Sequence, residues 1–114
     1  MTSPSHRVVE YLDHQGRSPF ARWLAQLDAQ AAARVVAVVY RLGSGNDANV
    51  KSVGSGVLER TIHSGPGYRI YFARDGEAWV ILLGGSTKRR QQDAIDAARE
   101  RWKDYRARKR EEQG

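Results

Sequence analysis

Apolar and polar positions follow a strand pattern at the start of the chain and a helical pattern directly after it. The run Arg7–Leu12 is β-branched and aromatic, which predicts a first strand. Ser18 and Pro19 then predict a helix start, because serine caps helices and proline at the first helical position loses only an unpaired N–H. The following apolar residues share one helix face at i, i+3, i+4 and i+7: Phe20, Trp23, Leu24 and Leu27.

A second helix is predicted from Asp28, a capping residue, to the loop Gly43-Ser44-Gly45-Asn46. Its apolar stripe consists of Ala31, Val35, Val38, Val39 and Leu42. Valine lowers helix propensity, but a stretch of this length without glycine or proline favours helix over strand. The two helical segments together predict an αα-hairpin.

The second half of the chain changes to short β-prone runs separated by glycine-containing turns. Strands are predicted over 57–62, 68–74 and 78–83, with Asp75-Gly76 as a hairpin turn between the last two. The run Trp79–Leu83 is apolar without alternation, which is typical of a central strand covered on both faces. Gly84–Thr87 is then expected to open a long helix, whose inner face carries Gln91, Ile95, Ala98, Trp102 and Tyr105.

This order, β-α-α-β-β-β-α, predicts the α+β class, with a small, mostly antiparallel β-sheet and the helical hairpin on one face. We expect the opposite face of the sheet to be open to solvent. Residues 1–114 are expected to form a single domain whose core spans about 6–105. Residues 106–114 have no apolar anchor and are expected to be a frayed basic tail.

Charge and composition narrow the class of partner. Nineteen Lys and Arg against thirteen Asp and Glu give a net charge of +6, which favours nucleic acid or an acidic protein as partner. The absence of cysteine excludes disulfides and thiolate chemistry, and three dispersed histidines do not predict a metal site. No apolar run is long enough to cross a membrane and the N-terminus lacks a signal-peptide pattern, so we expect a cytoplasmic protein without membrane contact.

Candidate chemistry lies on the expected open face. Burying Tyr68, Ile70 and Phe72 would leave Arg69 and Tyr71 pointing outward. The same alternation, with Leu58 and Ile62 in the core, turns Glu59, Thr61 and His63 outward on the preceding strand, and the start of the last helix could bring Lys88 close.

These residue types match the needs of RNA cleavage without a metal, which requires a proton acceptor, a proton donor and cations at the phosphate. His63 can transfer protons, Arg69 can pair with phosphate oxygens, Lys88 and Arg89 add positive charge, and Tyr71 can stack on a base. A lone exposed histidine can equally cap a turn. The hypothesis depends on an exposed Arg69 guanidinium.

Several strings resemble one known family. The run Ile62–Phe72, which contains Gly-Pro-Gly-Tyr-Arg, is similar to a hairpin of the phage-derived, HigB-like branch of the RelE/ParE toxins, whose members are termed addiction module killer proteins. The approach Lys51–Glu59, the helical hairpin and the helix from Gln92 also resemble that family, so that the likeness spans about residues 6–105.

The resemblance implies a βααβββ fold and the toxin of a type II toxin–antitoxin pair. It further implies an mRNA endoribonuclease (mRNA interferase) that acts on the ribosome without a cofactor and is neutralised by an adjacently encoded helix-turn-helix antitoxin. The functional candidates that match the family's motifs are Lys51, Glu59, His63, Arg69 and Lys88.

The chain departs from the family pattern at two places. Thr61 stands where many members of the branch carry an arginine, and alternation points the neighbouring Arg60 toward the helices. The last helix also begins without the tyrosine of some RelE-type nucleases. A ParE-like poison of DNA gyrase and a degenerate module that only binds antitoxin or RNA therefore remain alternatives. The basic stretch Arg99–Arg110 is interpreted either as a contact to ribosomal RNA or as a solvated helix face.

Overall fold

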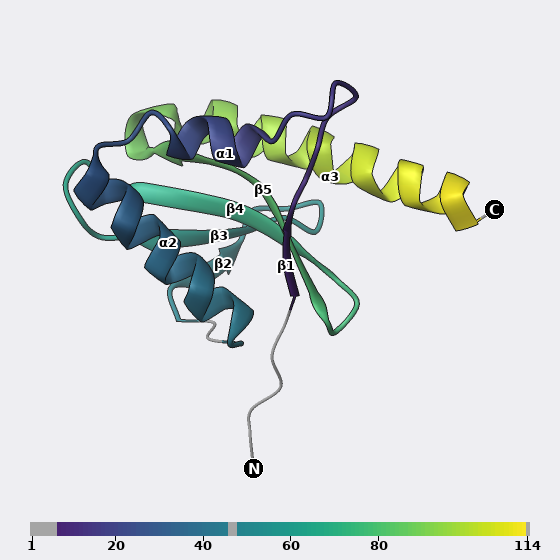
Figure 1. Cartoon of the computed structure of the whole chain (residues 1–114), viewed down its shortest axis with the longest axis horizontal. Coiled ribbons are helices and arrows are strands. Elements are labelled where there is room, and N and C mark those ends of the chain that lie inside the picture. Colours follow the sequence, from purple (N-terminus) through teal and green to yellow (C-terminus); the bar gives the residue numbers. More distant parts are fainter. Residues whose placement is uncertain (1–6, 46–47, 114) are drawn as a thin grey trace, which may run out of the picture.

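The computed structural model describes residues 7–45 and 48–113 of the chain (Figure 1). His6, one of the three histidines, Asn46 of the predicted loop and Gly114 at the end of the predicted tail lie outside these ranges. The elements are, in chain order, β1 (Arg7–Glu10), α1 (Pro19–Leu24), α2 (Ala29–Gly43), β2 (Val50–Ser52), β3 (Leu58–Ile62), β4 (Tyr68–Asp75), β5 (Trp79–Thr87), the 3-10 turn η1 (Lys88–Arg90) and α3 (Gln91–Gln113).

The strands form one five-stranded sheet in the order β1-β5-β4-β3-β2. The α+β class is confirmed, but the sheet is mixed, because β1 runs parallel to β5 while the other pairs are antiparallel. The short strand β2 was not predicted from the sequence. It pairs Lys51 with Glu59 at the edge of the sheet, and its three residues are too few to produce a clear alternation.

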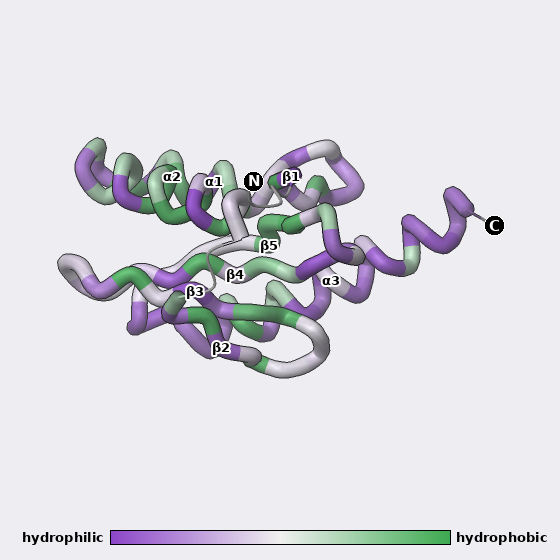
Figure 2. Tube along the Cα trace, turned by 90° about the horizontal axis from the view of Figure 1, so that it is seen from below, coloured by the Kyte–Doolittle hydropathy of each residue, from purple (hydrophilic) through white to green (hydrophobic). Residues whose placement is uncertain are grey.

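The helical hairpin covers one face of the sheet, as predicted (Figure 2). Both predicted caps are present: the Ser18 side chain accepts a hydrogen bond from the backbone N–H of Ala21 at 3.0 Å, and Asp28 accepts one from Ala31 at 2.8 Å. The core on this side joins the hairpin to alternate residues of the strands, and its buried members are Phe20, Ala31, Val35, Val38, Leu42, Ile62, Tyr68, Ile70, Phe72, Val80 and Leu82.

The expectation of an open opposite face is wrong, because α3 covers it (Figure 2). Ile95, Ala98 and Trp102 of α3 pack in a second core with Ile81 and Leu83 of β5. The prediction that β5 is a central strand covered on both faces is thereby confirmed, since Val80 and Leu82 belong to the first core. A strand that is apolar on both faces needs cover on both, and α3 supplies the second layer.

Strand β5 is longer than predicted, and its extension places the start of α3. It continues from Leu83 to Thr87, with a register shift between Tyr71 and Phe72 of β4 that leaves Leu83 as an additional residue. The stretch Gly84–Thr87, expected to open a helix, instead pairs with Tyr71–Tyr68. Backbone pairing with β4 holds this segment in the sheet. Its side chains are small and show no apolar alternation, so the sequence did not indicate a strand here.

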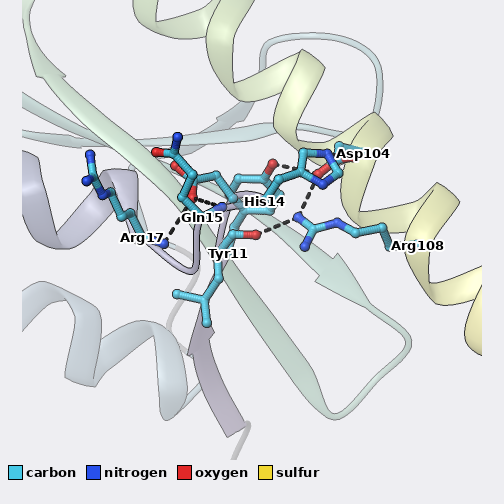
Figure 3. Close-up of polar contacts among 8 residues, drawn as sticks. Tyr11, His14, Gln15, Arg17, Asp104 and Arg108 are labelled. Atoms are coloured by element: carbon cyan, nitrogen blue, oxygen red, sulfur yellow. Dashed lines mark hydrogen bonds and ion pairs between the residues drawn. The ribbon is translucent and has the colours of Figure 1, made fainter.

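Polar contacts near Tyr11 hold α3 in place (Figure 3). The Tyr11 hydroxyl donates to the Asp104 carboxylate at 2.6 Å, and Arg108 donates to the same carboxylate at 2.6 Å and to the Leu12 carbonyl. Lys109 bonds Asp75 in a similar way. The helix continues to Gln113, and side-chain hydrogen bonds anchor it as far as Lys109, which contradicts the expected fraying from Arg106 onward.

Candidate functional site

The sequence-predicted candidates gather at one end of the sheet, where the β3–β4 turn meets η1. Ile62 and Thr87 both pair with Tyr68, so His63 and Lys88, which follow them, lie beside the same turn. The backbone N–H of Lys88 donates to the Gly67 carbonyl at 3.1 Å and joins η1 to that turn. His63, Lys88, Arg89 and Arg90 are exposed there, and we call these four residues the basic end.

Gly67 shapes this turn. Its φ of 75° lies in the left-handed region that favours glycine, and a side chain at this position would approach the Arg69 guanidinium, with the added Cβ 3.6 Å from Nη1. The guanidinium therefore lies directly against the turn, next to the basic end.

Arg69 is not exposed as expected, because only 12% of its side-chain surface is accessible. Its Nε lies 3.8 Å from a Glu59 carboxylate oxygen, and both Nε and Nη1 are buried without a hydrogen-bond partner. Arg69 thus faces the α3 side of the sheet, as alternation predicts, but α3 and the turn enclose most of it. Only a small part of the guanidinium can meet a ligand.

Glu59, a predicted substrate-binding residue, is fully buried, so the expectation that it points outward on an open face is wrong. Its carboxylate accepts a hydrogen bond from the Gln91 side chain at 2.8 Å and lies 3.6 Å from the Lys51 ammonium and 3.8 Å from Arg69. We call Lys51, Glu59, Arg69 and Gln91 the carboxylate cluster. Lys51 and Arg69 flank the Glu59 carboxylate from the two neighbouring strands. The Lys51 side chain remains 65% exposed.

Tyr71 is also fully buried and cannot stack on a base, which corrects its predicted role in substrate binding. Its ring belongs to the core beneath α3, and its hydroxyl lies 3.2 Å from the Ser86 hydroxyl. Burial raises the pKa of Tyr71 to about 12. The phenol is therefore a neutral, structural group at physiological pH.

This burial predicts an alkaline loss of stability. The folded pKa of Tyr71 is about 12 against a usual value of 10.0, so its contribution is complete below pH 10 and is lost as the pH rises toward 12. We expect the free energy of unfolding to fall over this interval, and to fall less in Tyr71→Phe. Urea titrations at a series of pH values measure both slopes, and equal slopes in the two proteins would rule out Tyr71 as the cause.

Arg60 lies on the side of the helical hairpin, as alternation predicts. Only 7% of it is exposed, and its guanidinium donates to the carbonyl of the adjacent Thr61. Burial, with a smaller effect of the Arg41 charge, lowers the pKa of Arg60. Arg60 does not lie on the α3 side of the sheet. It therefore does not replace the arginine that many members of the resembled branch carry at the position of Thr61.

The basic end offers a histidine and three cations on the surface, with the accessible part of Arg69 at its margin. Such a set can bind a phosphate and exchange a proton with a bound hydroxyl. Arg90 was not predicted, although its position directly after Lys88 and Arg89 could have indicated it. The bond from Gln91 to Glu59 was not predicted either, because only the packing of α3 creates it. Within residues 7–45 and 48–113, no group of three or more His, Asp or Glu side chains is placed to hold a metal ion.

Comparison with known proteins gives one informative relative. No family model matches the chain. A protein of Haemophilus influenzae (strain ATCC 51907 / DSM 11121 / KW20 / Rd), named only "Uncharacterized protein", is 38% identical over 81 residues, which are 70% of this chain and 82% of that protein. No helix among the described residues is long and apolar enough to span a membrane. The identity and its coverage show that the chain belongs to the same family as this Haemophilus influenzae protein.

Proposed function

We propose that the protein is the toxin of a type II toxin–antitoxin pair and cuts mRNA on the ribosome, in the cytoplasm, without a metal. The observation that best supports this proposal is the bond from the Lys88 N–H to the Gly67 carbonyl at 3.1 Å. It brings the cations of η1 beside the turn that carries His63. The cations of η1 can then contact an RNA phosphate while His63 contacts the neighbouring 2′-hydroxyl.

In the proposed reaction the RNA 2′-oxygen attacks the adjacent phosphorus, and the bond from phosphorus to the 5′-oxygen breaks. His63 accepts the proton of the 2′-hydroxyl, and water or the protonated imidazole returns a proton to the leaving oxygen. The products are a 2′,3′-cyclic phosphate and a 5′-hydroxyl. Lys88 and Arg89 stabilise the negative charge that develops on the phosphate, while Arg69 contributes mainly through its field because it is largely buried.

The proposed protein partner is an antitoxin encoded in the adjacent gene, with a helix-turn-helix domain. A chain of net charge +6 attracts acidic segments, which speeds association. Covering the basic end with such a segment would block access of mRNA.

Burial of Tyr71 and Arg69 favours a second candidate, a ParE-like poison of DNA gyrase. Two of the groups that a nuclease could use on its substrate are largely enclosed, and a poison needs no proton-transfer group. This reading leaves the exposed His63 without a chemical role.

Inducible expression with and without the adjacent gene tests both candidates. Growth arrest with new mRNA 5′ ends, relieved by the adjacent gene, supports the nuclease. Arrest with broken DNA and intact mRNA supports the gyrase poison. Growth without arrest contradicts both and leaves a module that only binds antitoxin or RNA.

In the same assay, His63→Gln is expected to slow mRNA cleavage about a hundredfold or more, because general acid–base groups contribute at least that factor. The fold and the association with ribosomes should persist, since the side chain is exposed. Arg41→Gln, an exposed change on α2, serves as the control for a general effect on expression. Cleavage by His63→Gln at the wild-type rate would remove His63 from the mechanism.

A further inference from the structure

The second half of β5 lacks a neighbouring strand on one side. Strand β1 pairs with β5 only from Trp79 to Leu82, and the backbone N–H of Tyr11 makes the last bond, to the Leu82 carbonyl at 2.9 Å. The chain then turns away toward α1. From Leu83 to Thr87 the described part of the protein pairs β5 with β4 alone.

The direction of the free backbone groups follows from the pairing with β4. Lys88 donates to the Gly67 carbonyl, so Lys88 faces β4, and alternation turns Ser86 and Gly84 the same way. The N–H and C=O groups of Gly85 and Thr87 therefore point away from β4, toward the missing neighbour. Exposure agrees, because Gly85 and Thr87 are half-buried while Gly84 and Ser86 are buried.

A groove between α1 and α3 runs along this edge. Its larger part has a volume of about 560 Å³ and is lined by residues of α1, of β5 and of α3, among them Trp23, Leu27, Gly85, Thr87, Ala94 and Ala97. A second part of about 340 Å³ continues toward Tyr11 and shares Trp23, Gly85 and Arg101. Figure 2 shows α1 and α3 on opposite sides of β5.

Arg101 marks where the paired edge of β5 ends. Its guanidinium donates to the Leu83 carbonyl at 3.0 Å, directly after the last bond from β1. Beyond it, Ala94 and Ala97 carry small side chains. The Trp23 indole covers one face of Gly85, so a main chain would approach Gly85 along the edge of the sheet.

We propose that this edge binds an extended segment of a partner polypeptide as an additional strand beside Gly85–Thr87. An exposed strand edge recognises extended peptides through main-chain hydrogen bonds, and alternate side chains supply the specificity. This inference does not depend on the proposed RNA cleavage, although the groove shares Arg90 with the basic end.

The walls of the groove define the chemistry of the segment. Side chains of an added strand point alternately to the two faces of the sheet. On one face they meet Trp23 and Leu27, which favour apolar residues. On the other they meet Arg90, Asp93 and Arg101, whose summed charge is positive and favours carboxylates on the segment. The partner segment therefore alternates apolar and acidic residues.

A proline at Thr87 tests the main-chain bonding directly. Thr87 has a φ of −85° and a ψ of 169°, which proline can adopt, and its N–H faces the groove rather than β4. Thr87→Pro thus removes one groove-facing donor and retains the pairing of β4 with β5. Thr87→Val is the matched control, because it changes the side chain and retains the N–H.

The probe is a set of peptides selected from a random library for binding to the full-length chain. We expect alternating apolar–acidic sequences that protect the Gly85 amide from hydrogen exchange. We expect Thr87→Pro to weaken their binding about tenfold, or about 1.4 kcal/mol, and Thr87→Val to change it little. Circular dichroism and thermal unfolding verify that both variants are folded.

Three results would overturn the proposal. They are failure of the library to yield any binder, protection of amides away from β5, and equal affinity for the folded Thr87→Pro and Thr87→Val variants. If Thr87→Pro does not fold, Ala97→Trp replaces it and must weaken the same peptides, because a tryptophan at this half-buried position of α3 fills the groove.

Discussion

Arg69→Ala is expected to lower the free energy of unfolding by about 3 kcal/mol. Removal of one partner from a buried ion pair costs about 3–5 kcal/mol, because the remaining charge loses its compensation. Glu59 would keep the Gln91 hydrogen bond at 2.8 Å and the Lys51 ammonium at 3.6 Å. The separation of 3.8 Å between Arg69 and Glu59 and the support from Lys51 place the expected loss at the lower end of that range.

Urea titration measures this loss, and two comparisons identify its cause. Lys88→Ala, which removes an exposed cation, should change the stability by no more than about 0.5 kcal/mol. The double variant Glu59→Leu/Arg69→Met should recover most of the lost stability, because apolar replacements of a buried pair are often neutral. An Arg69→Ala protein as stable as the wild type would mean that the carboxylate cluster contributes little to the fold.

This result would change how a functional test at Arg69 is interpreted. With an exposed guanidinium, as the alternation in the sequence predicts, Arg69→Ala would abolish toxicity and leave the fold intact. Since the side chain is largely buried beside Glu59, lost activity could arise from lost stability alone. His63 and Lys88, which are exposed, are the better positions for testing the proposed chemistry.

Gly85→Ala is expected to destabilise the protein by about 3 kcal/mol, through overpacking against Trp23. A Cβ at position 85 would lie 2.2 Å from the nearest atom of the indole ring, with two further ring atoms within 2.5 Å. The ring is held by Phe20 and Tyr68, whose centroids lie at 6.0 and 6.4 Å, so it cannot move without disturbing the first core. Overpacking of this kind costs about 1–3 kcal/mol or more.

A double-mutant cycle with Trp23→Leu separates this clash from other effects of the substitution. In the Trp23→Leu background, which has a smaller side chain over Gly85, the added methyl group should cost less than about 1 kcal/mol. Urea titration of the four proteins provides the coupling energy. An equal cost in both backgrounds would show that Trp23 does not determine the choice of glycine at this position.

Local sequence patterns were sufficient to predict most of the helices and strands. Ser18 and Asp28 cap the two helices of the hairpin as expected, because capping depends on residues within one turn. The alternation in β4 correctly assigned Tyr68, Ile70 and Phe72 to one core. The double burial of β5 was also predicted, because its apolar run lacks alternation.

Predictions that required knowledge of neighbouring layers failed. Arg69 and Tyr71 were correctly placed on the side of the sheet away from the hairpin, but their exposure depends on α3, whose position is set by contacts such as Tyr11 with Asp104. The helical turns after Tyr105 are secured by Arg108 and Lys109, whose partners are distant in sequence. No local pattern indicates such pairs.

By itself, the sequence determined the periods of most elements, the caps of the hairpin helices, the α+β class and the faces to which residues of β3 and β4 point, because these depend on nearest neighbours along the chain. The tertiary structure alone decided which faces are covered, and it thereby turned Glu59, Arg69 and Tyr71 from expected surface groups into buried ones. It also decided where β1 leaves β5, and so where a strand edge stays open. Both the covering of the sheet faces and the open edge of β5 depend on contacts between segments that are far apart along the chain.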